Sequence, residues 1–152
     1  MSAQLMDGKA LAAQKKAAIR AEVERLARTP GLAVVLVGEN PASQIYVRGK
    51  ARDCEECGIR CMDFRLPAQT TESELLTLIA ELNGRADVDG ILVQLPLPEG
   101  IRERRVLEAI APEKDVDAFH PENVGRLVQG QARYLPCTPA GVMELLRAAG
   151  VD

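Results

Sequence analysis

Short apolar runs alternate with longer amphipathic stretches along the first two thirds of the chain. The runs are brief, rich in β-branched residues and nearly free of charge, which is typical of strands buried in a sheet. The longer stretches repeat their apolar positions every three or four residues, which predicts helices with one buried face. We expect strands over residues 32–37, 59–66 and from 89 into the proline-rich loop at 96–98, and helices over 8–28, 43–57 and 71–84.

The order of these elements predicts the fold class. Strands that alternate with helices through short connections form a mostly parallel sheet covered by helices on both faces, so we expect a three-layer α/β/α fold. The last third of the chain is less regular. We expect a short helix over 102–110, a polar loop over 111–121, a short apolar segment at 124–127, and a last helix that ends at 149, with Thr138 as N-cap and Pro139 at its first position.

Length and charge narrow the function classes. A chain of 152 residues with a formal net charge of −3 is most simply one domain, and this charge gives no reason to expect nucleic acid or an anionic membrane as partner. No apolar run approaches the roughly 18 residues that a membrane-spanning helix requires. The N-terminus lacks the basic and then apolar order of a signal peptide, so we expect a cytoplasmic location.

Four cysteines raise the question of a metal or redox site. Cys54, Cys57 and Cys61 lie close together in sequence, whereas Cys137 lies far from them. A zinc or iron site needs four convergent ligands and the chain has a single histidine, so we expect reduced thiols and no metal. A thiol-based metal or redox protein remains an alternative. The chain also lacks the Gly-x-Gly-x-x-Gly and Gly-x-x-x-x-Gly-Lys fingerprints of nucleotide-binding loops and the Gly-x-Ser-x-Gly of serine hydrolases.

The turn after the first strand is the strongest candidate for a site. Gly38 permits a sharp turn, Asn40 is a suitable N-cap, and Pro41 suits the first helical position. Tyr46 and Lys50 then stand four residues apart, on one face of the helix. The carboxyl edge of a parallel sheet is where such folds bind ligands, so an aromatic ring beside an amine at this edge predicts a binding site.

Other polar residues could join this site, although each also has a structural interpretation. Gln94 lies near the carboxyl end of the third strand and should emerge at the same edge, unless its amide only satisfies the backbone. Asp115 and Asp117 flank Val116 and point to the same side if the segment is extended; otherwise they are loop or capping residues. We expect His120 to be structural, because nothing in the sequence gives it a proton-transfer partner.

Four blocks of sequence follow one another along the chain. They are Val37-Gly38-Glu39-Asn40-Pro41-Ala42-Ser43-Gln44-Ile45-Tyr46-Val47 with Lys50, Asp89-Gly90-Ile91-Leu92-Val93-Gln94-Leu95-Pro96-Leu97-Pro98, Pro112-x-Lys114-Asp115-Val116-Asp117-x-Phe119-His120-Pro121-x-Asn123-Val124-Gly125, and Pro136-Cys137-Thr138-Pro139-x-Gly141. In this order they resemble the bifunctional methylenetetrahydrofolate dehydrogenase/methenyltetrahydrofolate cyclohydrolase family. The resemblance runs over nearly the whole chain, but it covers only the N-terminal, folate-binding half of the family.

The resemblance implies an organisation and a function. Residues 1–137 would be the folate-binding catalytic domain, and 138–152 a helix that links it to a Rossmann domain outside this chain. That second domain would hold the cofactor NADP, so no cofactor site is expected here. The activity implied is oxidation of methylenetetrahydrofolate to methenyltetrahydrofolate, followed by hydrolysis to formyltetrahydrofolate, in one-carbon metabolism. The partner is a folate substrate, and the full-length form would be a homodimer.

The resemblance also implies roles for single residues. Lys50 matches the catalytic lysine, which can act as a base only when its amine is neutral, a form that a cationic ligand favours. Gln94 matches the glutamine that orients this amine, and Tyr46 the tyrosine that stacks along the aminobenzoyl ring of folate. Asp117 matches the aspartate that accepts two N–H donors from the pterin. Ser43 is close enough in sequence to line the same pocket.

The chain departs from the family pattern at two positions. Ala118 stands where the family has glycine, and its Cβ matters only if this backbone needs a positive φ or approaches the ligand closely. Gly49 stands inside a predicted helix where a longer residue is usual.

An alternative to the enzyme is a small-molecule-binding or regulatory module that kept the fold without catalysis.

Overall fold

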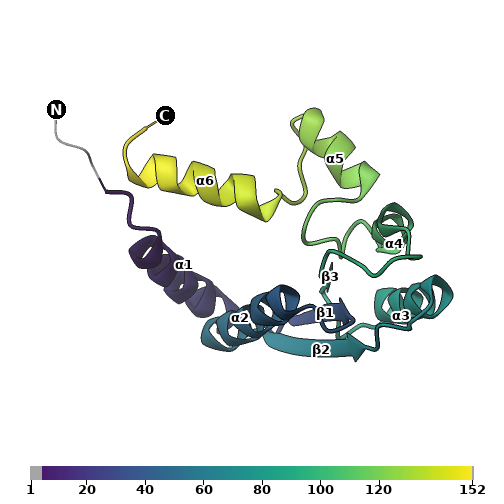
Figure 1. Cartoon of the computed structure of the whole chain (residues 1–152). Coiled ribbons are helices and arrows are strands. Elements are labelled where there is room, and N and C mark those ends of the chain that lie inside the picture. Colours follow the sequence, from purple (N-terminus) through teal and green to yellow (C-terminus); the bar gives the residue numbers. More distant parts are fainter. Residues whose placement is uncertain (1–4, 152) are drawn as a thin grey trace.

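Three parallel strands form the middle layer of the protein, which a computed structural model describes over residues 5–151 (Figure 1). β1 (Gly31–Val37) lies between β2 (Arg60–Leu66) and β3 (Gly90–Val93), and both pairings are parallel. The predicted α/β class and parallel sheet are therefore confirmed. The order β2-β1-β3 places β1 at the centre of the sheet, where it has a neighbour on each side.

Helices cover both faces of the sheet because β1 is apolar on both sides. One set of its side chains packs against α3 (Glu72–Gly84) and α4 (Glu103–Ala109), and the other packs against Val47 of α2 (Pro41–Cys57). Strands covered on both faces are continuous apolar runs rather than alternating patterns, as this one is. The two sets are Ala33, Val35 and Val37, and Val34 and Leu36.

Local capping signals set the ends of α2 and α3 as predicted. The side chain of Asn40 accepts hydrogen bonds from the backbone N–H groups of Ala42 and Ser43, at 3.0 and 3.2 Å, ahead of α2. Gly58 ends the same helix in the left-handed region, at φ 75°. Thr71 begins α3 with a capping box in which it exchanges hydrogen bonds with Glu74.

The first helix is shorter and more exposed than its sequence pattern predicts. α1 (Gly8–Val23) ends five residues before the predicted end at Arg28, and the residues that follow form turns and bends. The chain needs this connection to reach β1, and Pro30 disfavours helical backbone at the residue before it. None of the residues of α1 is buried, because the helix packs mainly along α2 and α6.

The last third of the chain holds two corrections. Residues predicted as a short apolar segment form α5 (Pro121–Val128), which begins where His120 Nδ1 accepts the backbone N–H of Glu122 at 3.1 Å. His120 is thus a capping residue. α6 (Cys137–Ala148) begins before Thr138, so the predicted cap at Thr138 was wrong. Within residues 5–151, no helix is long and apolar enough to cross a membrane.

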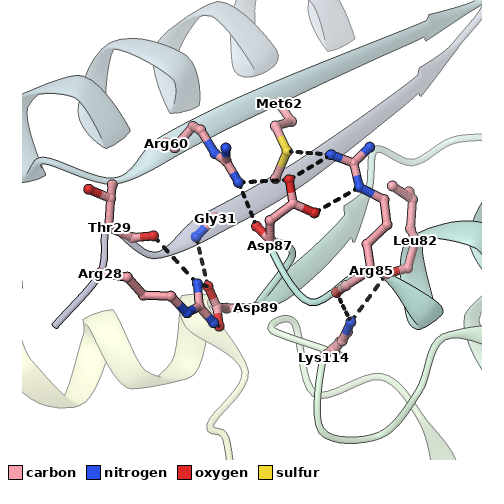
Figure 2. Close-up of polar contacts among 10 residues, drawn as sticks. All are labelled: Arg28, Thr29, Gly31, Arg60, Met62, Leu82, Arg85, Asp87, Asp89 and Lys114. Atoms are coloured by element: carbon pink, nitrogen blue, oxygen red, sulfur yellow. Dashed lines mark hydrogen bonds and ion pairs between the residues drawn. The ribbon is translucent and has the colours of Figure 1, made fainter. Parts of the chain in front are cut away.

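Carboxylates hold the amino ends of β1 and β3 together, as Figure 2 shows. Asp89, which precedes β3, accepts the backbone N–H of Gly31 at 2.8 Å and pairs with Arg28. Asp87 pairs with Arg60 at 2.9 Å and with Arg85 at 2.8 Å. These contacts fix the loop between α3 and β3 against the start of the sheet.

Lys114 ties the loop after α4 to the end of α3. Its ammonium donates to the carbonyl oxygens of Leu82, Asn83 and Arg85 at 3.2, 2.7 and 2.8 Å. Carbonyl groups in the last turn of a helix have no partner within the helix, and a cation at this end is favourable. Lys114 therefore caps α3 and fixes the start of the segment that carries Asp117.

We predict opposite effects of alanine at two glycines. Gly49→Ala should raise the free energy of unfolding by about 0.5–1 kcal/mol, because a helix-interior alanine loses less backbone entropy than glycine. A Cβ at Gly49 would meet no atom within 4 Å, whereas one at Gly31 would lie 2.1 Å from the carbonyl oxygen of Asp87. Gly31→Ala should therefore destabilise the fold. Denaturant unfolding followed by circular dichroism measures both changes, and a destabilising Gly49→Ala would contradict its open surroundings.

A second prediction concerns acid stability. Glu72 of α3 accepts the backbone N–H and Nε of Arg102 at 3.0 Å and pairs with Arg105. The hydrogen bonds with Arg102 lower the pKa of Glu72 from 4.5 to about 2. A carboxylate whose pKa is lower in the folded state stabilises the fold at pH values above its unfolded-state pKa. This stabilisation is lost as the pH falls through the folded-state pKa. Glu72→Gln should therefore lower the melting temperature at pH 7, and its difference from the wild type should shrink between about pH 4.5 and 2.

Thermal melts at closely spaced pH values test this prediction. Glu108→Gln is a matched control, because Glu108 pairs only with Arg104 on its own helix. The control should show no comparable convergence with the wild type at low pH. A difference between Glu72→Gln and the wild type that stays constant from pH 7 to pH 2 would contradict the assigned contact.

Candidate functional site

Helix α2 presents an aromatic ring and an amine on the same face. Tyr46 and Lys50 lie one helical turn apart, and the Lys50 ammonium is 5.9 Å from the centroid of the Tyr46 ring. This distance is within the range of cation–π attraction. The ring of Tyr46 is largely exposed, at 65%, while Lys50 is half-buried. The predicted pairing of ring and amine is present, with the ring open to solvent.

Gln94 reaches Lys50 from the carboxyl end of β3. Its Oε1 accepts a hydrogen bond from Lys50 Nζ at 3.3 Å, and its Nε2 donates to the carbonyl oxygen of Leu95 at 2.8 Å. The second hydrogen bond fixes the orientation of the amide, so that the oxygen faces the amine. Strand β3 ends beside β1, where the backbone N–H of Gln94 also bonds the carbonyl of Val35 at 2.8 Å.

The two aspartates of the loop after α4 have different surroundings. Asp115 is 1% exposed, and its Oδ2 accepts the backbone N–H of His120 at 2.8 Å and Asn123 Nδ2 at 2.9 Å. Asp117 instead lines a cavity together with Lys50. The segment is a turn around Val116 and not an extended strand, so the two carboxylates do not share one side. Asp115 is structural, and Asp117 is available to a ligand.

A cavity of about 570 Å³ lies over one face of the sheet, between the strands and the segment before α6. Its polar side chains include Lys50, from α2, and Asp117, from the loop after α4. Its floor is apolar. The remaining lining residues are Pro30, Gly31, Leu32, Ile59, Asp89, Gly90, Leu92, Val116, Tyr134, Cys137 and Thr138.

The cavity extends farther from the carboxyl edge of the sheet than the sequence predicts. Gly31 and Gly90, which line it, are the first residues of β1 and β3. The reason is the direction of α2, which runs back across the sheet after the turn at Gly38. Lys50 follows Pro41 by nine residues, about 14 Å along the helix axis at 1.5 Å per residue. The predicted position at the carboxyl edge thus holds for Gln94 but not for the cavity.

The surroundings of Asp117 make its carboxylate a receptive acceptor. Burial raises the pKa of Asp117, and the nearby ammonium of Lys50 opposes this shift. Its neighbour Cys137 has Sγ at 4.0 Å from Asp117 Oδ1 and at 3.9 Å from the carbonyl of Val116, and partial desolvation at the cavity edge raises the pKa of this otherwise exposed thiol. A desolvated carboxylate gains from any ligand that supplies N–H donors.

Three predicted site residues, Ser43, Tyr46 and Gln94, do not line the cavity, and one residue that was not predicted does. Ser43 is 3% exposed in the first turn of α2 and does not line the cavity with Lys50. Tyr134 does line it, and its hydroxyl donates to the carbonyl oxygen of Glu113 at 2.6 Å, yet the sequence analysis did not single it out. The available signal was weak: Tyr134 is the only other tyrosine of the sequence and lies two residues before the Pro-Cys-Thr-Pro block.

The start of α2 does not fit the phosphates of a dinucleotide. Such phosphates bind to free N–H groups at the amino end of a helix that follows a strand. Here Pro41 has no N–H, and the N–H groups of Ala42 and Ser43 already bond the side chain of Asn40. Within residues 5–151 there is also no group of three or more His, Cys, Asp or Glu side chains that could hold a metal ion.

Comparisons with known proteins identify the family of this chain. The family model for the tetrahydrofolate dehydrogenase/cyclohydrolase catalytic domain matches residues 6–117. The bifunctional protein FolD of Nitratidesulfovibrio vulgaris (strain DSM 19637 / Miyazaki F) is 62% identical over 146 residues, which are 93% of this chain and 51% of that protein. FolD of Geotalea daltonii is 57% identical over 99% of this chain and 55% of its own length.

Solved structures give the same result. The bifunctional FolD enzyme of Campylobacter jejuni is 50% identical, with a TM-score of 0.95 over 98% of this chain and 54% of that one. The Trypanosoma brucei enzyme, solved with NADP cofactor and inhibitor, is 38% identical, with a TM-score of 0.93 over 100% of this chain and 54% of its own. The chain spans about half the length of the curated relatives it matches. It belongs to the tetrahydrofolate dehydrogenase/cyclohydrolase family, of which it contains the catalytic domain.

Proposed function

We propose that this chain is the folate-binding, catalytic half of an enzyme that oxidises methylenetetrahydrofolate with NADP and hydrolyses the resulting methenyltetrahydrofolate to formyltetrahydrofolate. The observation that supports this proposal most directly is the contact between Lys50 Nζ and Gln94 Oε1, beside a cavity that Lys50 and Asp117 both line. The family match supports a role for these residues in folate chemistry.

The cavity suits a pterin. The edge of a pterin offers a ring N–H and an amino group, and a carboxylate such as that of Asp117 accepts two such donors at once. The apolar residues Leu32, Leu92 and Val116 line the same cavity and would contact the faces of the ring. Tyr46, one turn before Lys50, would stack along the aminobenzoyl group on the solvent side.

Lys50 and Gln94 account for the hydrolytic step. Water adds through its oxygen to the cationic methenyl carbon, and the side-chain nitrogen of Lys50 accepts the proton that the water loses. One carbon–nitrogen bond of the resulting adduct then breaks, which leaves a formyl group on one nitrogen and returns a proton to the other. Gln94 holds the amine toward the reacting carbon, because its own amide is fixed by the carbonyl of Leu95.

Because the start of α2 does not fit dinucleotide phosphates, we propose that NADP binds to a domain beyond this chain. Residues 1–137 would form the folate-binding domain and 138–152 the link to that second domain. The exposed apolar side chains Val142 and Met143 of α6 are consistent with further chain packing there. A homodimer of the complete enzyme and a cytoplasmic location belong to the same proposal.

Replacement of Lys50 tests catalysis. Lys50→Met should reduce methenyltetrahydrofolate hydrolysis to the uncatalysed rate, because it removes the base and keeps a side chain of similar length. The affinity for 5-formyltetrahydrofolate should stay within about threefold, since Asp117 still accepts the pterin donors. Loss of methenyl absorbance measures the first, and calorimetry the second. Lys9→Met, at an exposed position in the first turn of α1, is the matched control.

The outcomes separate the two candidate functions. Wild-type hydrolysis rates in Lys50→Met would refute the assignment of the base. Binding of folate by the wild type without any hydrolysis above background would favour the non-catalytic binding module. Metal analysis of the purified chain addresses the thiol-based alternative, because stoichiometric zinc or iron on the cysteines would support it.

Replacement of Asp117 tests the pterin contact. Asp117→Ala should weaken folate binding by about 1.5–3 kcal/mol, the scale of hydrogen bonds to a charged group. Since burial raises the pKa of Asp117, the wild-type affinity should also fall as the pH drops through that raised value, and the variant should lack this dependence. Calorimetry over a pH series measures both effects. Asp63→Ala, at an exposed position on β2, serves as control, and unchanged affinity of Asp117→Ala would exclude the pterin role.

A further inference from the structure

The segment that carries Asp117 is docked along the edge of β3. The backbone N–H of Ile91 donates to the carbonyl oxygen of Lys114 at 2.7 Å, and Ile91 forms a parallel bridge with Asp115. These contacts continue the sheet by one short step beyond β3. They place Val116 directly over the start of this strand, immediately before Asp117 in the chain.

The close approach depends on Gly90. A Cβ at this position would lie 2.5 Å from Val116 Cγ1 and 3.2 Å from Leu32 Cδ1. Gly90 does not have a positive φ, so its backbone conformation is open to any residue, and only the lack of space excludes a side chain. Valine has little freedom about χ1, so Val116 cannot move away without moving its backbone.

A displacement of Val116 would reach Asp117, because the turn is held at both ends. On one side, Lys114 caps α3 and Asp115 bonds the N–H of His120. On the other side, Ala118 is 1% exposed and adopts φ 57°, a conformation that leaves a non-glycine residue little freedom. A shift of Val116 would therefore be taken up at Val116 and Asp117, between these anchors. Val116 and Asp117 both line the cavity, and Asp117 is the one with a polar side chain.

We propose that Gly90 is a positioning residue for folate recognition: the absent side chain lets Val116 seat on β3 and thereby aims Asp117 into the cavity that Lys50 lines. This inference rests on the proposed function, since it assumes that Asp117 accepts the pterin. The glycine of the Asp-Gly-Ile-Leu-Val block thus affects ligand binding through the position of Asp117, although Gly90 has no side chain with which to contact a ligand.

A double-mutant cycle in the full chain tests the proposal. Gly90→Ala should raise the Kd for 5-formyltetrahydrofolate by about tenfold or more, a change that calorimetry resolves readily. Val116→Ala removes the atom with which the new Cβ collides. The double variant should therefore bind within about threefold of Val116→Ala alone. Gly84→Ala, where a Cβ would meet nothing within 4 Å, is the matched control and should bind as the wild type does.

A second readout reports the position of the turn without any folate. Cys137 is exposed, and its Sγ lies beside the carbonyl of Val116 and Oδ1 of Asp117. The rate of alkylation of Cys137 by iodoacetamide, measured by mass spectrometry of its peptide, should change at least about threefold in Gly90→Ala and return in the double variant. A purely global loss of stability would not produce a change confined to Cys137, because Cys54 and Cys57 are buried and would become reactive with it.

Each outcome decides the proposal. Unchanged affinity and unchanged Cys137 alkylation in a folded Gly90→Ala variant would overturn it, as would a double variant no better than Gly90→Ala. If Gly90→Ala does not fold, the double variant must still fold and bind as Val116→Ala does, and its failure would also overturn the proposal. If the wild type itself does not bind folate, the proposed function fails, and the alkylation rates alone decide whether Gly90 sets the turn.

Discussion

The docking of the loop after α4 on the edge of β3 is the contact on which the candidate site depends. Asp117 has no strand or helix of its own, and only the backbone bond from Ile91 to Lys114 and the anchors on either side bring it to the cavity. The polar contacts at the amino ends of β1 and β3 hold β3, on which this loop docks, against the rest of the sheet (Figure 2). The carboxylate of Asp117 is on a loop, but this loop is hydrogen-bonded to the sheet immediately before it.

The second constraint is the way α2 begins. In many parallel α/β proteins the amino end of the first helix binds phosphate, but here Asn40 and Pro41 occupy or remove those donors. The useful chemistry moves instead to the side of the helix, where Tyr46 and Lys50 project one turn apart. The capping interaction fixes the start of the helix, and Lys50 on its side donates to Gln94.

Local signals in the sequence were enough for the strands, for the caps of α2 and α3, and for the meeting of Gln94 with Lys50. That meeting follows from topology, because parallel strands place their carboxyl ends on one edge. The end of α1, the existence of α5 and the different directions of Asp115 and Asp117 were not predicted. Each of these depends on tertiary contacts, such as the bond from Asp115 to His120, that no short pattern contains.

The motif Lys114-Asp115-Val116-Asp117 also shows why a resemblance does not by itself separate structure from function. Lys114 caps α3, and Asp115 accepts a hydrogen bond within the turn. Of these three charged residues, Asp117 is the one that lines the cavity. Ala118 extends this argument. Its φ of 57° costs a non-glycine residue about 1–2 kcal/mol, while its methyl group, 1% exposed, recovers roughly 0.8 kcal/mol by burial. The net cost is small enough for the turn to keep its shape, so the alanine at this position leaves Asp117 at the cavity.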